Sequence, residues 1–145
     1  MVEAGRKLNI SMQIVALIGL LDSLYLTWVK LSHTEAACLP GIGNCETVNT
    51  SRYASIYGIP IALLGAGAYL TIFAILLLER RKGFWMDNGA MIIFGLSLIG
   101  LLYSAYLTYI ELAVLHAVCP YCVLSALAIL AIFLINLVRL TRNQA

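Results

Sequence analysis

Two of the four cysteines in the chain form a Cys-x-x-Cys pair, Cys119-Pro120-Tyr121-Cys122, at the start of an apolar segment. The other two, Cys38 and Cys45, lie in an earlier polar segment with six residues between them. A thiolate attacks a disulfide through a mixed disulfide, so two cysteine pairs that reach one another can pass electrons by exchange. The N-terminal N–H groups of a helix would stabilise a thiolate in the Cys-x-x-Cys pair. The cysteines therefore favour a thiol–disulfide relay.

Three other interpretations of the cysteines remain open: two structural disulfides, a zinc site of four thiolates, and thiols with unrelated roles. Structural disulfides typically support small soluble domains that lack a core. Structural zinc sites usually combine two tight cysteine pairs, and a spacing of six residues is loose for one of them. We therefore expect the cysteines to hold no metal.

The composition of the chain indicates a membrane protein. Of its 145 residues, 62% are hydrophobic and only 11% are charged, whereas a soluble domain carries roughly a quarter charged residues. A core of this size could not bury so much apolar surface away from water. The net charge of +2 is too small for nucleic-acid binding. We expect a single domain, residues 1–145, with no appended soluble module.

Four segments are long enough to cross a bilayer as helices, at about residues 8–29, 59–78, 88–110 and 117–138. The last three contain no Asp, Glu, Lys or Arg, whereas the first contains Gln13 and Asp22. The first segment is too long to be a cleaved secretory signal. The sequence therefore predicts an all-α integral membrane protein, a four-transmembrane-helix bundle with an outer loop over residues 30–58.

The basic residues of the short connections predict the orientation, because Lys and Arg are retained on the cytoplasmic side. Seven of the nine lie in the two tails and the middle connection: Arg6, Lys7, Arg80, Arg81, Lys82, Arg139 and Arg142. Both termini should be cytoplasmic in a cell inner or plasma membrane. The outer loop and a short turn from Glu111 to His116 should then face outward with all four cysteines, where disulfides form.

The chain also contains an internal repeat. Residues 19–38 laid over residues 100–119 are identical at ten of twenty positions without a gap, and Ser23, Tyr25 and Cys38 match Ser104, Tyr106 and Cys119. The first and third segments run in the same direction, so the match predicts a parallel duplication with an axis along the membrane normal. Shared composition of apolar helices is the alternative explanation.

Together these motifs resemble the vitamin K epoxide reductase family in its bacterial or archaeal form, along nearly all of the chain. The resemblance rests on Ser23-Leu24-Tyr25 with Val29-Lys30, on Cys38 and Cys45 followed by Val48, Ser51 and Tyr53, on Gly58-Ile59-Pro60 with Leu64-Gly65, and on Ser104, Tyr106-Leu107 and Cys119-Pro120-Tyr121-Cys122. A loop pair followed by a Cys-x-x-Cys at the fourth of four helices is a specific combination. In disulfide bond formation protein B, an analogous bacterial protein, the Cys-x-x-Cys lies in the earlier outer loop.

The resemblance implies a helix bundle around a quinone, partly covered by an outer loop that carries a short interfacial helix. It implies that Cys119 and Cys122 are the catalytic pair, with Cys122 nearest the quinone. Cys38 would meet a reduced extracytoplasmic thioredoxin-fold partner, and Cys45 would exchange with Cys119. Ser51 would hydrogen-bond near Cys45 or cap the short helix. The electron acceptor would be a quinone of the ubiquinone, menaquinone or vitamin K type.

The chain departs from vertebrate members of that family at two positions that help to hold the vitamin K ring. It has Ala126 where they carry a tyrosine, and Ala74, by gapless counting, where they carry an asparagine. The resemblance therefore supports quinone reduction, with vitamin K quinone or epoxide reduction as an alternative. No thioredoxin-like domain is expected after the fourth helix.

Two ionisable residues near the predicted site are further candidates. Asp22 lies inside a span, where such a residue marks function by default; it either delivers protons to the quinone or bonds to a neighbour such as Ser104 or Tyr106. His116 precedes Cys119 by three residues and could steady a thiolate, although a solvated role is the commoner one. A non-enzymatic carrier of a soft metal is the competing function, but its ligands should lie deeper in the helices.

Overall fold

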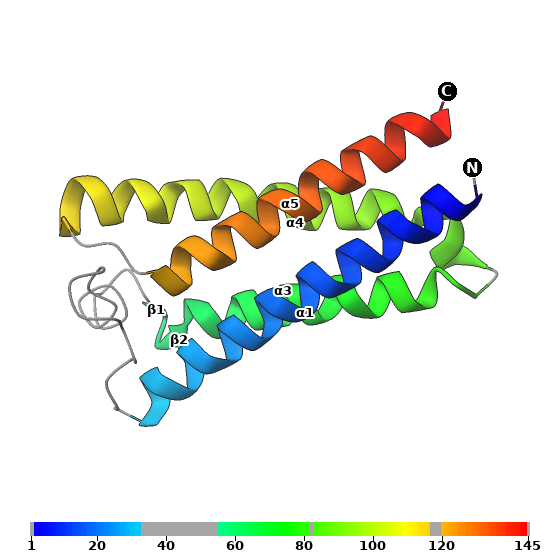
Figure 1. Cartoon of the computed structure of the whole chain (residues 1–145). Coiled ribbons are helices and arrows are strands. Elements are labelled where there is room, and N and C mark those ends of the chain that lie inside the picture. Colours follow the sequence, from blue (N-terminus) through cyan, green and yellow to red (C-terminus); the bar gives the residue numbers. More distant parts are fainter. Residues whose placement is uncertain (1, 33–54, 82, 117–119, 145) are drawn as a thin grey trace.

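The computed structural model describes residues 2–32, 55–81, 83–116 and 120–144. Within these residues lie four long helices, α1 (Val2–Ser32), α3 (Ile61–Leu78), α4 (Phe84–Ile110) and α5 (Pro120–Gln144) (Figure 1). Each contains a stretch long and apolar enough to cross a membrane: Gly5–Ser32, Ile61–Leu78, Asn88–Val114 and Pro120–Arg142. The predicted all-α bundle of four membrane-spanning helices is confirmed.

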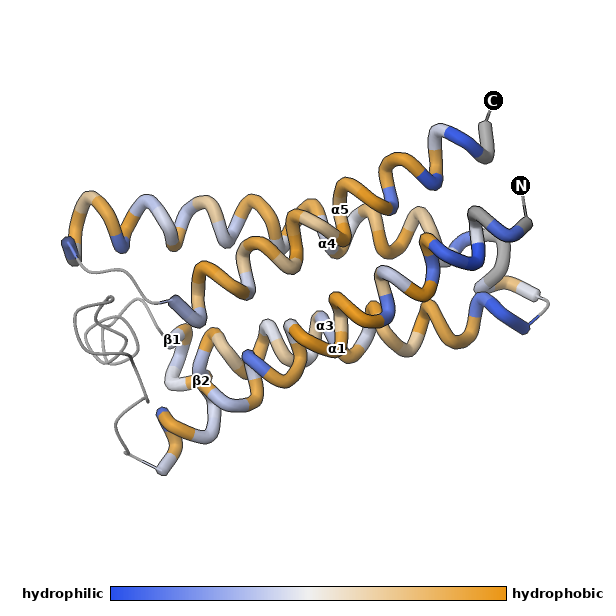
Figure 2. Tube along the Cα trace, in the orientation of Figure 1, coloured by the Kyte–Doolittle hydropathy of each residue, from blue (hydrophilic) through white to orange (hydrophobic). Residues whose placement is uncertain are grey.

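The outer surface of the bundle is apolar along most of its length. Figure 2 shows hydrophobic residues through the middle of the helices and hydrophilic residues gathered toward their ends. Large apolar side chains such as Leu21, Leu70 and Leu102 are more than half exposed. Helices satisfy their backbone hydrogen bonds internally, so these side chains can face lipid without exposing polar groups.

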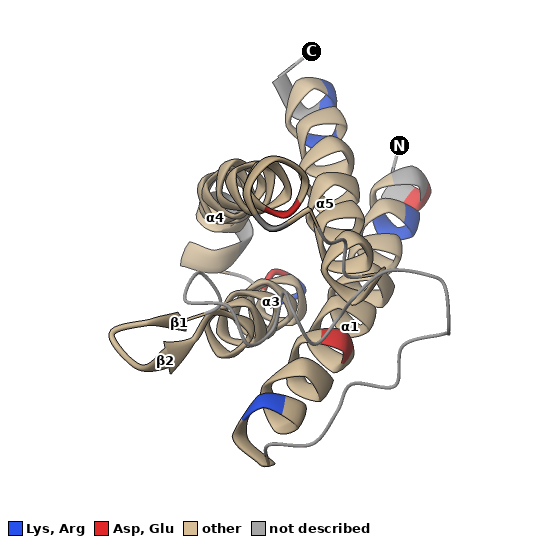
Figure 3. Ribbon diagram, turned by 90° about the vertical axis from the view of Figure 1, so that its left-hand side faces the viewer, with Lys and Arg blue, Asp and Glu red and all other residues tan. Residues whose placement is uncertain are grey.

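The helices form a ring in which each one packs against two others. Helix α1 contacts α3 and α5, and α4 contacts the same two helices. Helices α1 and α4 therefore lie diagonally across the bundle (Figure 3), and they run in the same direction (Figure 1), as the sequence repeat predicts. The central core contains Met12, Ile72, Leu76, Ile93 and Ile132.

Polar contacts join three helices at the end of the bundle that holds both termini (Figure 1). The Arg139 guanidinium on α5 lies 2.7 Å from Glu79 Oε2, which follows α3, and these side chains are 17% and 3% exposed. Asn9 of α1 donates a hydrogen bond of 3.3 Å to the same carboxylate. These two contacts tie α1, α3 and α5 together far from the predicted cysteine end.

The second span begins two residues later than predicted. Strand β1 (Ser55–Ile56) pairs antiparallel with β2 (Ile59–Pro60), and the turn residues Tyr57 and Gly58 have φ angles of 52° and 81°. Two successive positive φ angles are typical of the tight turn that joins a β-hairpin. Pro60 has an extended conformation, so helix α3 begins only at Ile61.

The predicted turn from Glu111 to His116 is wrong. Helix α4 continues into a π-helical turn, η2 (Glu111–Leu115), and ends at His116, which has a φ of 50°. No glycine or proline occurs between Gly100 and Pro120 to stop the helix earlier. Helix α1 likewise continues beyond its predicted end to Ser32.

Candidate functional site

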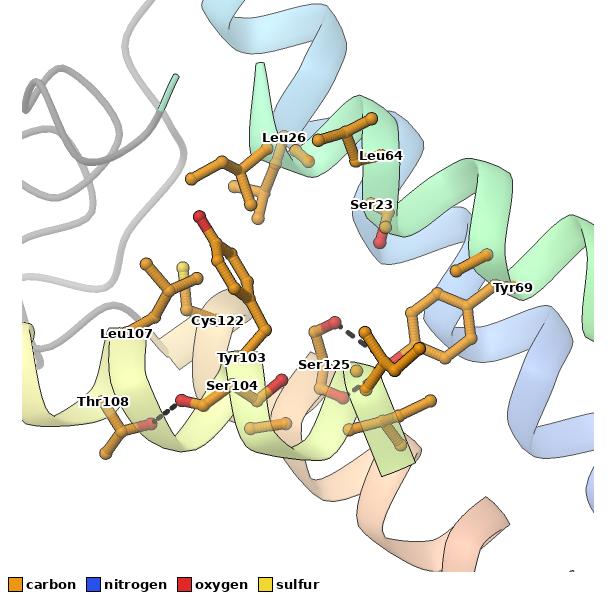
Figure 4. Close-up of a pocket in the computed structure, with 18 of the residues that line it drawn as sticks. Ser23, Leu26, Leu64, Tyr69, Tyr103, Ser104, Leu107, Thr108, Cys122 and Ser125 are labelled. Carbon is orange, nitrogen blue, oxygen red and sulfur yellow. Dashed lines mark hydrogen bonds between the residues drawn. The ribbon is translucent and has the colours of Figure 1, made fainter. Parts of the chain in front are cut away.

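A cavity of about 450 Å³ lies among the four helices, toward the end of the bundle away from the termini (Figure 4). This volume falls in the range of pockets for small molecules. Its walls are mainly aliphatic, with Leu26 from α1, Leu64 from α3, Leu107 from α4 and Ile129 from α5. The cavity therefore offers a mainly apolar surface to a ligand.

Helix α5 presents one face to this cavity. Cys122, Ser125, Ala126 and Ile129 line it, and their spacing of three, four and seven residues places them along a single helix face. Cys122 is the third residue of α5, so it lies in the first turn, where backbone N–H groups lack intrahelical partners. These groups and the helix dipole favour the thiolate form of a cysteine. A potential nucleophile therefore lies in the wall of an apolar cavity.

Tyr69 and Ser125 connect α3 to α5 beside the cavity (Figure 4). The Tyr69 hydroxyl donates to the Ser125 carbonyl oxygen at 2.6 Å and lies 3.1 Å from Ser125 Oγ. The tyrosine ring packs against Gly19 of α1, where an added Cβ would lie 2.5 Å from the ring carbons Cε1 and Cζ. Glycine at this position therefore allows the buried tyrosine to reach α5.

Two serines add hydroxyl groups to the cavity wall, Ser23 from α1 and Ser104 from α4. The Thr27 hydroxyl donates to the Ser23 carbonyl oxygen at 2.8 Å. The Thr108 hydroxyl donates to the Ser104 carbonyl oxygen at the same distance. The two halves of the sequence repeat thus have the same local structure at the cavity.

An aromatic contact positions the beginning of α5. The rings of Tyr25 on α1 and Tyr121 on α5 have centroids 5.2 Å apart with an angle of 48° between their planes. Tyr121 directly precedes Cys122 in the sequence. This contact holds the Cys122 end of α5 against α1, and tilted ring pairs of this kind are favourable.

The structure places one of the four predicted cysteines, Cys122, in the cavity wall. Cys38, Cys45, Ser51 and Cys119 lie outside the described residues, as does the segment expected to form the short interfacial helix.

The two ionisable candidates lie apart from the cavity lining. Asp22 is 7% exposed, and neither carboxylate oxygen has a hydrogen-bond partner among the described residues. Of the two alternatives for Asp22, the bond to a neighbour such as Ser104 or Tyr106 is therefore not formed among the described residues. His116 is exposed at the end of η2, which agrees with a solvated role. Within the described ranges no three His, Cys, Asp or Glu side chains gather into a metal site.

Sequence reasoning missed the Tyr69–Ser125 pair, although two signals could have found it. Tyr69 is the one tyrosine in the segment 59–78, and Ser125 follows Cys122 by three residues and so shares its helix face. Of the two departures from vertebrate sequences, Ala126 lines the cavity, whereas Ala74 is exposed on α3 and does not.

Comparisons with known proteins show the family of the chain. The sequence pattern of the vitamin K epoxide reductase family matches residues 10–137. The chain is also 34% identical over 95 residues to the thiol-disulfide oxidoreductase LTO1 of Arabidopsis thaliana. That match covers 63% of this chain but only 25% of the relative, so the chain spans about a quarter of the plant protein. The chain is an integral membrane protein that belongs to the vitamin K epoxide reductase family.

Proposed function

We propose that the chain is a membrane thiol–disulfide oxidoreductase that passes electrons from a reduced thioredoxin-fold protein to a quinone. The observation that carries the proposal is the position of Cys122, in the first turn of α5 and in the wall of an apolar cavity. The plant relative, whose name describes a thiol-disulfide oxidoreductase, supports the same class of reaction.

The electrons move by thiol–disulfide exchange in the first steps. A thiolate of the reduced partner attacks the Cys38–Cys45 disulfide; the partner leaves as a disulfide, and both loop cysteines are reduced. Cys45 then attacks Cys119 in the Cys119–Cys122 disulfide, and closure of the Cys38–Cys45 bond releases the reduced pair. Each exchange moves two electrons, and relative reduction potentials set its direction.

The last step regenerates the Cys119–Cys122 disulfide while the quinone substrate takes up two electrons and two protons to become the quinol. The ring is planar and apolar, and the cavity matches this chemistry with aliphatic walls and a few hydroxyl groups. The protein places the Cys122 sulfur against the ring and excludes water from it. Cys122, in the first turn of α5, lines this cavity.

We also propose that this end of the bundle faces the outside of the cell, in keeping with the basic residues at the opposite end. Both termini and the connection between α3 and α4 share that opposite end (Figure 1). The partner would then dock from an oxidising compartment, where a loop disulfide persists. The chain would support disulfide formation in secreted proteins.

Anaerobic quinone reduction by the purified protein, with dithiothreitol as the electron donor, tests the proposal. The parent should reduce a ubiquinone or menaquinone analogue, Cys122→Ala should be inactive, and Cys38→Ala should retain turnover because a small thiol bypasses partner docking. Loss of turnover with a reduced thioredoxin-fold donor in Cys38→Ala would assign the loop pair to partner exchange. No reduction of either quinone by the parent would refute the proposal and favour the metal carrier.

A further inference from the structure

We propose that Ser23 and Ser104 donate hydrogen bonds to the two carbonyl oxygens of a para-quinone, one serine to each oxygen. This inference rests on the proposed function and adds the groups that orient the ring. It starts from the sequence repeat, in which Ser23 of α1 and Ser104 of α4 occupy the same position.

The two serines also share their local structure. In each helix a threonine four residues later donates to the serine carbonyl oxygen at 2.8 Å. The threonine hydroxyls are occupied by these bonds, whereas the Ser23 and Ser104 hydroxyls form no hydrogen bond within the described residues. A serine inside a helix commonly bonds a carbonyl oxygen of its own preceding turn, so the absence of that bond leaves both hydroxyls able to bond a ligand.

The serines approach the cavity from different sides. Helices α1 and α4 lie diagonally across the bundle, with α3 and α5 between them. Figure 4 shows the Ser23 and Ser104 side chains on separate walls of the cavity, one from each of these helices. The carbonyl oxygens of a para-quinone lie at opposite ends of its ring, so a symmetric acceptor needs donors on two sides.

The other hydroxyl groups of the cavity are less suited to this role. The Tyr69 hydroxyl is committed to Ser125, and the Thr108 hydroxyl to the Ser104 carbonyl. Tyr103 lies near Cys122 (Figure 4), on the side where the ring must meet the sulfur. The Ser23 and Ser104 hydroxyls line the cavity and have no hydrogen-bond partner within the described residues, so a bound ring with acceptors at both ends would give each of them one.

Infrared difference spectroscopy of a bound short-chain ubiquinone tests the proposal without turnover. The quinone carries ¹³C at one carbonyl carbon, so its two carbonyl bands are resolved. In the parent both bands should lie below their positions in an aprotic solvent. Ser23→Ala should raise one band and Ser104→Ala the other, and each change should weaken quinone binding about fivefold, the loss expected for one neutral hydrogen bond.

Ser97→Ala is the matched control, because Ser97 is a buried serine of α4 that bonds the Phe94 carbonyl oxygen and does not line the cavity. It should leave both bands and the quinone affinity unchanged, and thermal unfolding should verify that all variants are folded. The proposal is overturned if neither serine variant moves a band, if both move the same one, or if only Tyr103→Phe moves one. In those cases quinone turnover by the parent would still uphold the proposed function, whereas a parent that binds and reduces no quinone would refute both.

Discussion

Replacing Arg139 with leucine should destabilise the protein strongly at neutral and alkaline pH, and only slightly in acid. The Glu79 carboxylate that pairs with Arg139 at 2.7 Å is 3% exposed. Within the described residues, its other side-chain hydrogen bond is the one from Asn9, at 3.3 Å. Removing one partner of a buried ion pair leaves an uncompensated charge, which typically costs about 3–5 kcal/mol. We expect a loss of about 3 kcal/mol at pH 8, because Asn9 still donates to the carboxylate.

The pH dependence follows from the pKa of Glu79. Burial raises the pKa of this carboxyl above its ordinary value of 4.5, while the hydrogen bond and positive charge of Arg139 lower it. Without Arg139 the folded-state pKa rises further. A carboxyl whose pKa is raised on folding favours the folded state when protonated, and this contribution is lost as pH rises through the folded-state pKa. The deficit of Arg139→Leu should therefore be small near pH 4 and grow toward pH 8.

The free energy of unfolding should be measured at a series of pH values by reversible unfolding in mixed detergent micelles. The double variant Glu79→Gln with Arg139→Leu removes both charges and should recover much of the stability with a flat pH profile. Lys7→Leu is a second control, since the Lys7–Glu3 pair is 74% exposed on both sides and should contribute nothing measurable. A deficit of Arg139→Leu that stays below about 1 kcal/mol at pH 8, or is the same at every pH, would refute the reasoning.

Three further predictions concern the surroundings of the cavity. Tyr69→Phe removes the hydroxyl that bonds Ser125 and should lower stability by about 1 kcal/mol in the same unfolding assay; an unchanged value would show that the bond contributes nothing. Gly19→Val forces a side chain against the Tyr69 ring and should lower stability by about 1–3 kcal/mol, whereas Gly67→Ala, with nothing within 4 Å of the added Cβ, should not. Asp22→Asn should stabilise the protein, because the buried carboxylate oxygens lack partners among the described residues. If Asp22 delivers protons, the same change should slow anaerobic quinone reduction by at least about tenfold. Unchanged turnover would exclude that role.

The number and approximate positions of the helices could be predicted from sequence because lipid imposes a simple rule on them. A membrane span of about 20 apolar residues has few alternatives to a helix. Helices α3, α4 and α5 all follow this rule. The helix ends were harder to predict, since they depend on local stops. Pro60 delayed the start of α3, and the lack of any breaker before His116 extended α4.

The candidate site could be predicted only in part. The position of Cys122 in the first turn of a helix could be predicted from the motif, because motif and helix are contiguous in the chain. Its place in the wall of a cavity was an expectation from the family resemblance alone. The Tyr69–Ser125 bond joins residues 56 positions apart, and its formation depends on how α3 turns relative to α5 and on the space left at Gly19. Side-chain contacts of this kind depend on how the helices pack, and the hydrophobic periodicity of the sequence alone does not determine the packing.

The diagonal placement of α1 and α4 has an evolutionary consequence. A single repeat unit would supply one serine-bearing wall and leave it open to lipid, so an ancestral unit could enclose a cavity only by associating with a second copy. Once both copies share one chain, their matching positions can diverge independently. Asp22 and Tyr103 are aligned in the repeat, yet one is a buried carboxyl outside the cavity lining and the other is a phenol within it. Under the predicted duplication, fusion would turn a symmetric enclosure into one whose two sides can specialise.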